Sequence, residues 1–371
     1  MSRLGYLLPK NFRSIPFKKF VFVMPKPVKM DLGSSFTRIK MENRVVFHDR
    51  TAIIFHEETH DVIAIGQAAE IFQGRVPTGM KLVRPIRMGK VSDVTATNLF
   101  LKAVLHKVNE SSTSMMLPFI SQGVVVATGA ATSQVQKELL VHFFRNLHAS
   151  CTFKSKSEAL FGSVLTPQML SGVWCCLDIG GMTTEVAIWA NGQVISQQTL
   201  DLGGNHFTEQ VLSVTKKKYQ AEIGWLTAEQ IKKNLLCLSG ATVTEVEQAA
   251  AIGSVDYHPK SRRIKKEEVK NEPGKFTVRA RSSTTDLPTT ILLSAEPYRE
   301  PLTDVAEELV WLIKEAMQDL SPELLSTSLE NGLILTGGGS LLPGLASYIE
   351  QQLQTTVVLS AYPREDVIRG L

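Results

Sequence analysis

The stretch that most constrains the fold is Cys176–Glu185, which reads Cys-Leu-Asp-Ile-Gly-Gly-Met-Thr-Thr-Glu. An apolar run leads to Asp178 and to a turn with Gly180 and Gly181, and a second apolar run follows. Two strands joined by such a turn predict a β-hairpin whose backbone N–H groups and hydroxyls can bind a phosphate. The acid that enters the turn is suited to hold a magnesium ion, directly or through water. An ordinary hairpin shares this pattern, so the prediction depends on further turns of the same kind.

Two further glycine turns lie far away in the sequence. In the segment 31–37 an acid precedes Gly33 and hydroxyl side chains follow it. In the segment 336–340, which reads Thr-Gly-Gly-Gly-Ser, the turn follows an apolar strand and precedes a predicted helix. A strand, a glycine turn and a helix N-terminus together predict an anion site. The three turns, near Gly33, Gly180 and Gly338, divide the chain into two comparable halves.

Length and composition exclude several classes of protein. The chain has 371 residues, which is enough for about two domains. Its net charge of +4 is too small to indicate a nucleic-acid partner, and none is expected. The four cysteines lack the spacing of a metal site and are expected to be reduced thiols in a cytoplasmic protein. No apolar run is long enough to predict a transmembrane helix.

Two segments have a composition suited to a membrane surface. Residues 1–29 contain seven Lys or Arg and no acid, with aromatic side chains between them. Such a segment either binds anionic lipid or is a disordered or strand-forming leader, and its four prolines argue against one long helix. A polar loop further on carries five large apolar residues, which either pack on the protein or insert into a bilayer. These residues are Met115, Met116, Leu117, Phe119 and Ile120.

Several stretches together resemble the MreB family of bacterial actins, within the superfamily of actins, sugar kinases and chaperone ATPases. The stretches that carry the resemblance are Asp178–Ile188, Arg84–Asp93, Gly203–Phe207 and Leu335–Leu345. The resemblance implies an α/β fold of two actin-like domains, with ribonuclease-H-like halves and a nucleotide cleft between them. The implied division is a basic extension over 1–29, domain I over 30–165 and domain II over 166–371, with a smaller subdomain near 225–300 and a charged insertion near 255–275.

The resemblance also implies roles for individual residues. It implies that Asp31 and Asp178 support Mg²⁺ beside ATP. The implied nucleotide contacts are Gly33, Ser34, Ser35, Phe36, Gly180, Gly181, Met182, Thr183, Gly204, Glu229, Lys232, Gly337, Gly338, Gly339, Ser340 and Leu341. The apolar loop at 115–120 falls where MreB proteins carry a loop that inserts into the membrane. The implied function is a filament at the inner face of the cell membrane that sets cell shape together with cell-wall synthesis and shape proteins.

Three departures from the family pattern bear on hydrolysis. Phe36 stands where the family has a polar Asn, and Met182 stands where the family has a third glycine. The Glu-Glu-Pro segment that positions the attacking water aligns with residues 153–156, which contain no acid. Because phosphoryl transfer depends on positioning, these departures predict nucleotide binding with at most slow ATPase activity, and no catalytic residue is assigned. The alternatives are a nucleotide-binding membrane adaptor of pilus or division type and a small-molecule kinase on the same fold.

Overall fold

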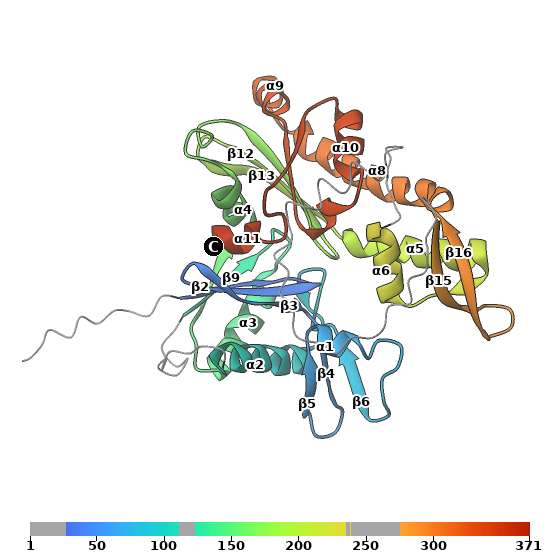
Figure 1. Cartoon of the computed structure of the whole chain (residues 1–371). Helices are drawn as coiled ribbons and strands as arrows, with labels where there is room; N and C mark the ends of the chain where they lie inside the picture. Colours follow the sequence, from blue (N-terminus) through green and yellow to red (C-terminus); the bar gives the residue numbers. More distant parts are fainter. Residues whose placement is uncertain (1–26, 111–122, 235–237, 239–274) are drawn as a thin grey trace, which may run out of the picture.

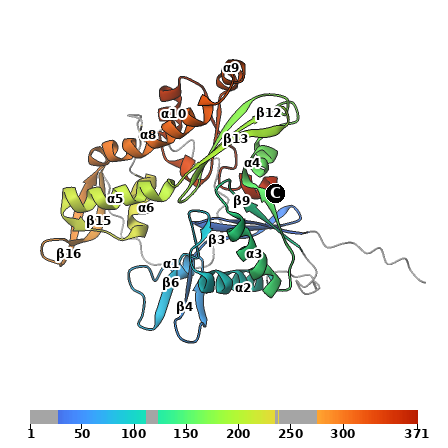
Figure 2. The same cartoon turned by 180° about the vertical axis from the view of Figure 1, so that it is seen from behind.

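The computed structural model describes residues 27–110, 123–234, 238 and 275–371. These residues form two halves, each built on a five-stranded mixed sheet, as Figure 1 and the opposite view in Figure 2 show. The basic extension as far as residue 26, the apolar loop at 115–120 and the charged insertion as far as residue 274 lie outside the described residues.

The first half is built on a sheet in which the central strand β1 pairs parallel to β9 and antiparallel to β2. In spatial order its strands are β10 (Cys151–Ser155), β9 (Val124–Thr128), β1 (Val28–Leu32), β2 (Phe36–Met41) and β3 (Arg44–Arg50). Val28 and Met30 are two residues apart, so both face the core of this half, where α2 (Val94–Glu110) and α3 (Gln134–Asn146) contribute apolar stripes. The Ser133 hydroxyl accepts a hydrogen bond from the Gln136 N–H and so caps the start of α3.

Smaller elements extend the first half on one side. They are a sheet of β5 (Val62–Ile65), β4 (Ile53–His56) and β6 (Met80–Val83), the short helix α1 (Gln67–Glu70), and the pair β7 (Ile86–Arg87) and β8 (Lys90–Val91). A small core of Ala52, Ile54 and Ala69 joins α1 to this sheet.

The second half contains the predicted hairpin, which is confirmed as β11 and β12, with Asp178 opposite Glu185. In spatial order its strands are β13 (Gln193–Leu200), β12 (Thr184–Ala190), β11 (Trp174–Ile179), β17 (Leu333–Thr336) and β18 (Val357–Leu359). Successive residues of β11 are buried on opposite faces, because helices cover both sides of the sheet. The helices of this half include α5 (Gly204–Tyr219), α8 (Glu296–Gln318), α9 (Pro322–Asn331) and α10 (Leu345–Leu353).

A three-stranded sheet and one helix lie beside α5. The sheet consists of β14 (Ala221–Glu222), β15 (Lys275–Ser282) and β16 (Pro288–Ser294), and the helix is α6 (Trp225–Asn234). The sequence predicts strands over 276–283 and 289–293 that form a hairpin, and the antiparallel pairing of β15 with β16 confirms this prediction.

Local sequence patterns predict a helix capped by Thr227 and helices that begin at Pro301 and Leu342, and these three starts are wrong. Helix α6 begins at Trp225, so Thr227 lies inside it and does not cap it. Helix α8 begins at Glu296 and continues through Pro301, which was predicted as its start. The glycine turn after β17 continues into the short 3₁₀ helix η2 (Gly338–Leu341), and α10 begins only at Leu345. The turn is therefore not the N-terminus of α10.

Two short helices fill the space between the two main sheets. Ala159 of α4 (Lys156–Val164) is buried with Ile368 of α11 (Asp366–Gly370), beside strand β9 of the first half. Phe161 of α4 is buried with Cys176 of β11 in the second half. Helix α4 therefore packs on both halves, and its first residue lies near the ends of strands from each. None of the helices among the described residues is long and apolar enough to cross a bilayer.

Candidate functional site

The three glycine turns lie together where the two halves meet. A Cβ atom added to Gly181 would lie 1.9 Å from Ser35 Oγ, so the first and second turns are in contact. A Cβ atom added to Gly204 would lie 3.5 Å from both the carbonyl oxygen of Gly180 and the Cα of Gly339. The start of α5 therefore lies between the second and third turns. The folded chain brings together turns that are about 150 residues apart in sequence.

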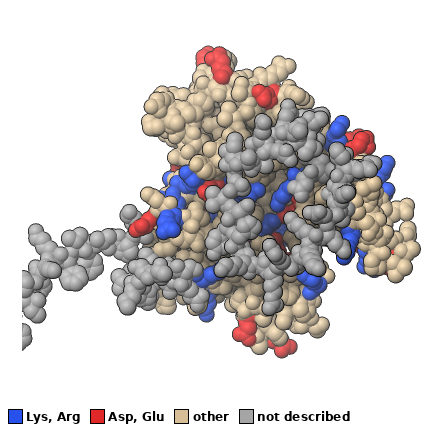
Figure 3. All heavy atoms as spheres, in the orientation of Figure 1, with Lys and Arg blue, Asp and Glu red and all other residues tan. Residues whose placement is uncertain are grey.

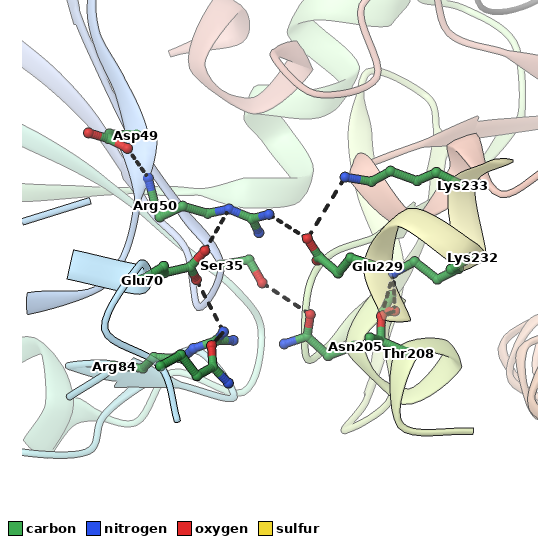
Figure 4. A network of polar contacts seen from close by, with 12 residues as sticks. Ser35, Asp49, Arg50, Glu70, Arg84, Asn205, Thr208, Glu229, Lys232 and Lys233 are labelled. Atoms are coloured by element: carbon green, nitrogen blue, oxygen red, sulfur yellow. Dashed lines mark hydrogen bonds and ion pairs between the residues drawn. The ribbon is translucent and has the colours of Figure 1, made fainter. Parts of the chain in front are cut away.

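Backbone hydrogen bonds fix the second turn against the start of α5. The Gly180 N–H donates to the Thr183 carbonyl at 2.9 Å, and the Gly204 N–H donates to the Gly180 carbonyl at 2.9 Å. Ser35 lies across from this assembly, with its Oγ 3.5 Å from Asn205 Oδ1, as Figure 4 shows. These contacts hold the first turn opposite the second, with the Ser35 side chain lying against Gly181.

The third turn differs from the others because part of it is open. Gly337 has a φ of +84°, and a Cβ atom there would lie 2.3 Å from Asp178 Oδ1, so this position requires glycine. Gly338 is exposed, and a Cβ atom added there would meet nothing within 4 Å. Ser340 donates its hydroxyl to the Gly337 carbonyl at 2.6 Å and stabilises the turn. Leu341 ends η2.

A cavity of about 80 Å³ lies between the halves at the first and second turns. Its lining includes Asp31, Gly33, Ser34, Lys156, Thr183 and Glu185. Ser34 Oγ accepts a hydrogen bond from the Gly89 N–H at 3.2 Å, and Met182 is buried with 7% of its surface exposed. A larger open hollow of about 780 Å³ between α5 and α8 contains none of the predicted site residues.

The two acids predicted to support magnesium each face a cation of this chain. Asp31 pairs with Arg38 at 3.0 Å, and Asp178 forms an ion pair with Lys156. The Asp178 side chain is only 4% exposed. Across the described ranges, no group of three or more His, Cys, Asp or Glu side chains is arranged to hold a metal ion. A metal at Asp178 would compete with the Lys156 ammonium for the same oxygen, so these residues do not fit Mg²⁺.

Lys156 is a residue whose role the sequence did not reveal. It is the first residue of α4. The preceding residue, Ser155, caps the helix, because its hydroxyl accepts a hydrogen bond from the Glu158 N–H. Burial alone would lower the pKa of Lys156, but attraction to Asp178, Glu185 and Asp31 outweighs burial and raises it above its ordinary value. The signal in the sequence was a lysine within the segment where the family carries two acids.

Glu185 completes the acidic surroundings of Lys156. It accepts hydrogen bonds from the Ser157 hydroxyl and from the Ala130 N–H, the latter at 3.2 Å. Burial raises the pKa of the Glu185 carboxyl, and the nearby Lys156 ammonium opposes that shift. Ser157 belongs to α4 and Ala130 follows β9, so this carboxylate joins the hairpin of the second half to the first half.

A second group of polar contacts joins the halves through α6, and Figure 4 shows it. Arg50 pairs with Glu229 at 2.6 Å and with Glu70 at 3.2 Å. Arg84 pairs with Glu70 at 3.1 Å, and its guanidinium lies 5.3 Å from the centre of the Trp225 ring. We name these five residues the α6 contact. Glu229, predicted to contact the adenosine, is here ion-paired across the halves.

Cations gather around the α6 contact. Figure 3, which has the orientation of Figure 1, shows Lys and Arg side chains near the middle of the face in view. We name as the cleft cations Arg38, Arg50, Lys232, Lys233 and Arg364. Burial and repulsion from Arg38 and Arg50 lower the pKa of Arg364, and burial lowers the pKa of Lys232 to about 8. Crowded like charges are suited to bind an anion with several negative charges.

Two of the residues expected to contact the nucleotide, Phe36 and Lys232, lie among the cleft cations. Phe36 begins β2, and its ring centre lies 4.4 Å from the Arg50 guanidinium and 5.5 Å from that of Arg38. Lys232 donates hydrogen bonds to the Gly204 carbonyl and to the Thr208 hydroxyl, each at 2.7 Å. These two bonds leave the third N–H donor of the ammonium for a ligand. Phe36 therefore supports cations through its ring, although it offers no hydrogen bond itself.

Comparison with solved structures places this fold among the bacterial actins. The chain superimposes on MreB 5 of Spiroplasma citri bound to AMPPNP with a TM-score of 0.78 and 22% identity, over 94% of this chain and 95% of that one. It superimposes on a subunit of the MamK double helical filament with a TM-score of 0.67 and 15% identity, over 93% of this chain and 97% of that one. The predicted two-domain actin-like α/β fold is thus confirmed.

Comparison of sequences gives the family. The chain is 26% identical to the cell shape-determining protein MreB of Escherichia coli (strain K12), over 95% of this chain and 94% of the relative. It is 25% identical to the cell shape-determining protein Mbl of Bacillus cereus (strain ATCC 10987 / NRS 248), over 93% of this chain and 94% of the relative. The family model described as MreB/Mbl protein matches residues 25–272 and 262–371, which together span most of the sequence. The chain belongs to the MreB/Mbl family.

Proposed function

We propose that this chain is a cell shape-determining cytoskeletal protein that binds a nucleoside triphosphate between its halves and assembles into filaments. The observation that carries the proposal is the meeting of the three glycine turns beside the cleft cations. Glycine turns offer backbone N–H groups, and clustered cations offer charge, and a polyphosphate requires both.

The family supports the remaining parts of this proposal. Relatives are named cell shape-determining proteins, one solved neighbour holds AMPPNP and another forms a double helical filament. We propose ATP as the nucleotide and self-association as the mode of assembly. Magnesium at Asp31 and Asp178 is left out of the proposal because each acid already has a cationic partner.

We also propose slow hydrolysis and a location at the inner face of the cell membrane, with cell-wall synthesis and shape proteins as partners. Slow hydrolysis follows from the absence of an acid at residues 153–156, where Ser155 caps α4 and Lys156 binds Asp178. The membrane proposal depends on the composition of residues 1–29 and 115–120. Both segments together suit reversible binding to anionic lipid, strengthened in a filament by repetition of the contact.

The test of nucleotide binding is a substitution at the open part of the third turn. Gly338→Asp places a carboxylate where a Cβ atom meets nothing within 4 Å, so the fold is undisturbed while phosphate is repelled. We expect isothermal titration calorimetry to show a loss of ATP affinity of at least about tenfold. Gly338→Ala is the matched control, since it adds the Cβ atom without charge and should bind as the wild type does.

Two outcomes would contradict this proposal. Equal ATP affinity in Gly338→Asp and Gly338→Ala would place the nucleotide elsewhere. Absence of binding in the wild-type chain would remove the nucleotide from the proposal. Pelleting with ATP in the same series separates the alternatives, because a filament supports the cytoskeletal function, whereas turnover that requires an added acceptor indicates a kinase. Nucleotide binding with neither property indicates an adaptor.

A further inference from the structure

We propose that the Lys156 ammonium is a built-in cation of the site, occupying the position between the halves where a divalent ion would otherwise lie. The chain would therefore bind its nucleotide with little dependence on Mg²⁺. This inference rests on the proposed function, because it states which cation accompanies the nucleotide. Three observations carry it: the acids around Lys156, the rigidity of its support, and its place in the cavity lining.

The first observation is the charge around the ammonium. Lys156 Nζ forms an ion pair with Asp178 from the second half, and Asp31 from the first half and Glu185 also attract it. The ammonium therefore supplies, beside the Asp178 carboxylate, the positive charge that a hard metal ion would supply, although the three acids are not themselves arranged as a metal site. Among the described residues, Lys156 is the one cation ion-paired with Asp178, so its removal would leave a buried carboxylate with no counter-charge.

The second observation is that the backbone of Lys156 is held firmly. Its helix begins at a serine cap and is buried by Ala159 and Phe161 against both halves. Gly370 of α11 lies so close that a Cβ atom there would be 1.7 Å from the Ala159 carbonyl oxygen. A surface lysine samples many rotamers, whereas this one is directed from a fixed helix start to Asp178, near Glu185 and Asp31.

The third observation is that the ammonium remains in reach of a ligand. The Lys156 side chain is 19% exposed, and it lines the cavity together with Gly33, Ser34 and Thr183. These three residues belong to the first and second turns, where we propose that the phosphates bind. A phosphate that enters would find a positive charge already present there, and an ammonium has three N–H donors to share.

The first experiment requires no substitution. ATP affinity of the full chain is measured by calorimetry in excess Mg²⁺ and again in EDTA. We expect the two dissociation constants to agree within about threefold. A loss of about tenfold or more in EDTA would overturn the built-in cation while leaving the proposed nucleotide function intact. Absence of binding in both conditions would instead reject the proposed function, and the second experiment then decides the inference.

The second experiment uses Mn²⁺ as a probe of the nucleotide-free protein, read from the decrease of the free-ion signal in electron paramagnetic resonance. We expect the wild type to bind Mn²⁺ weakly and Lys156→Met to bind it at least about tenfold more tightly, because the ammonium has been removed from the acids. Lys156→Met with Asp178→Asn should lose that gain. Equal Mn²⁺ binding in wild type and Lys156→Met would overturn the inference.

Lys154→Met is the matched control for the second experiment. Lys154 lies two residues earlier, and its ammonium donates to the Gly370 carbonyl at 2.8 Å instead of facing a carboxylate. It should therefore show no gain in Mn²⁺ affinity, and an equal gain would assign the effect to lost positive charge in general. Circular dichroism checks that each variant is folded, and the double substitution guards against misfolding because it removes both members of the buried pair.

Discussion

Among single residues, Lys232 has a chemical state that ordinary changes of pH can alter. Its ammonium lies at the start of α5 and donates two hydrogen bonds, to Gly204 and Thr208. Burial lowers its pKa from 10.5 to about 8, although Glu229 opposes that shift. A cation with so low a pKa loses its charge in mildly alkaline solution, while most lysines retain theirs.

We therefore expect ATP affinity to fall as the pH rises above about 8. Below the folded-state pKa of about 8 the ammonium is charged and attracts phosphate, and above it the neutral amine does not. Calorimetry between pH 7 and pH 9.5 measures the effect. Lys232→Met should bind ATP more weakly at pH 7 and should lose most of the pH dependence. If that variant keeps the wild-type slope, another group is responsible.

Residue-level predictions from the sequence depended on local signals. Gly180 and Gly338 could be located because glycine turns after apolar strands are local patterns. The ion pairs of Lys156 and Glu229 could not be predicted, because their partners Asp178 and Arg50 lie 22 and 179 residues away. Only the folded backbone brings such groups together. The cations that face the expected magnesium ligands could not be predicted either, because only the folded chain places Arg38 beside Asp31 and Lys156 beside Asp178.

Among the elements, α4 and α11 connect the two main sheets. Ile368 of α11 is fully buried, and it packs on Ala159 of α4 beside Val125 and Ala127 of β9. The ammonium of Lys40 on β2 donates to the Arg369 carbonyl at 2.8 Å and ties α11 to the first half. The short C-terminal helix is therefore a structural part of the interface between the halves.

We expect Ile368→Ala to destabilise the fold by about 2–5 kcal/mol, because it leaves a cavity in a closely packed core. Urea unfolding followed by circular dichroism measures this change. Val358→Ala is a suitable control, since Val358 is 52% exposed on the edge strand β18 and its truncation should have a much smaller effect. A loss at Ile368 no larger than at Val358 would show that α11 does not contribute to the core.

Whole elements were predicted well where hydrophobic periodicity was strong, and poorly where a boundary depended on packing. The β11–β12 hairpin and the β15–β16 hairpin follow from apolar runs separated by turn residues. The start of α6 was misplaced at Thr227 because a capping residue is only a local preference, and Trp225 contacts Arg84 of the other half. That contact is invisible to a pattern of neighbouring residues.

For the whole molecule, the α6 contact joins the two halves through the side chains of Arg50 and Glu229, which are 179 residues apart in sequence. The side chains of Arg50 and Glu229 are only 13% and 9% exposed, so solvent screens their attraction weakly. Glu70 pairs with both Arg50 and Arg84, and the ion pairs therefore form one network. Residues of a shared network are expected to be energetically coupled.

We expect a double-mutant cycle of Arg50→Met and Glu229→Gln to give a coupling free energy of about 0.5–3 kcal/mol. Thermal or urea unfolding of the four proteins provides the values. The control cycle uses Arg281 and Asp286, whose pair at 3.0 Å is 59% and 76% exposed and should show no measurable coupling. Zero coupling between Arg50 and Glu229 would mean that the halves are held by other contacts.

The α6 contact also affects the affinity that is observed for a ligand. If a nucleotide enters only when Arg50 and Glu229 are apart, the observed dissociation constant is the intrinsic one divided by the fraction of molecules in the open state. A chain that is open about one time in a hundred would bind about a hundredfold more weakly than its contacts alone allow. A relative with identical glycine turns but without this ion pair would then bind nucleotide more tightly, with no change in the residues that contact it.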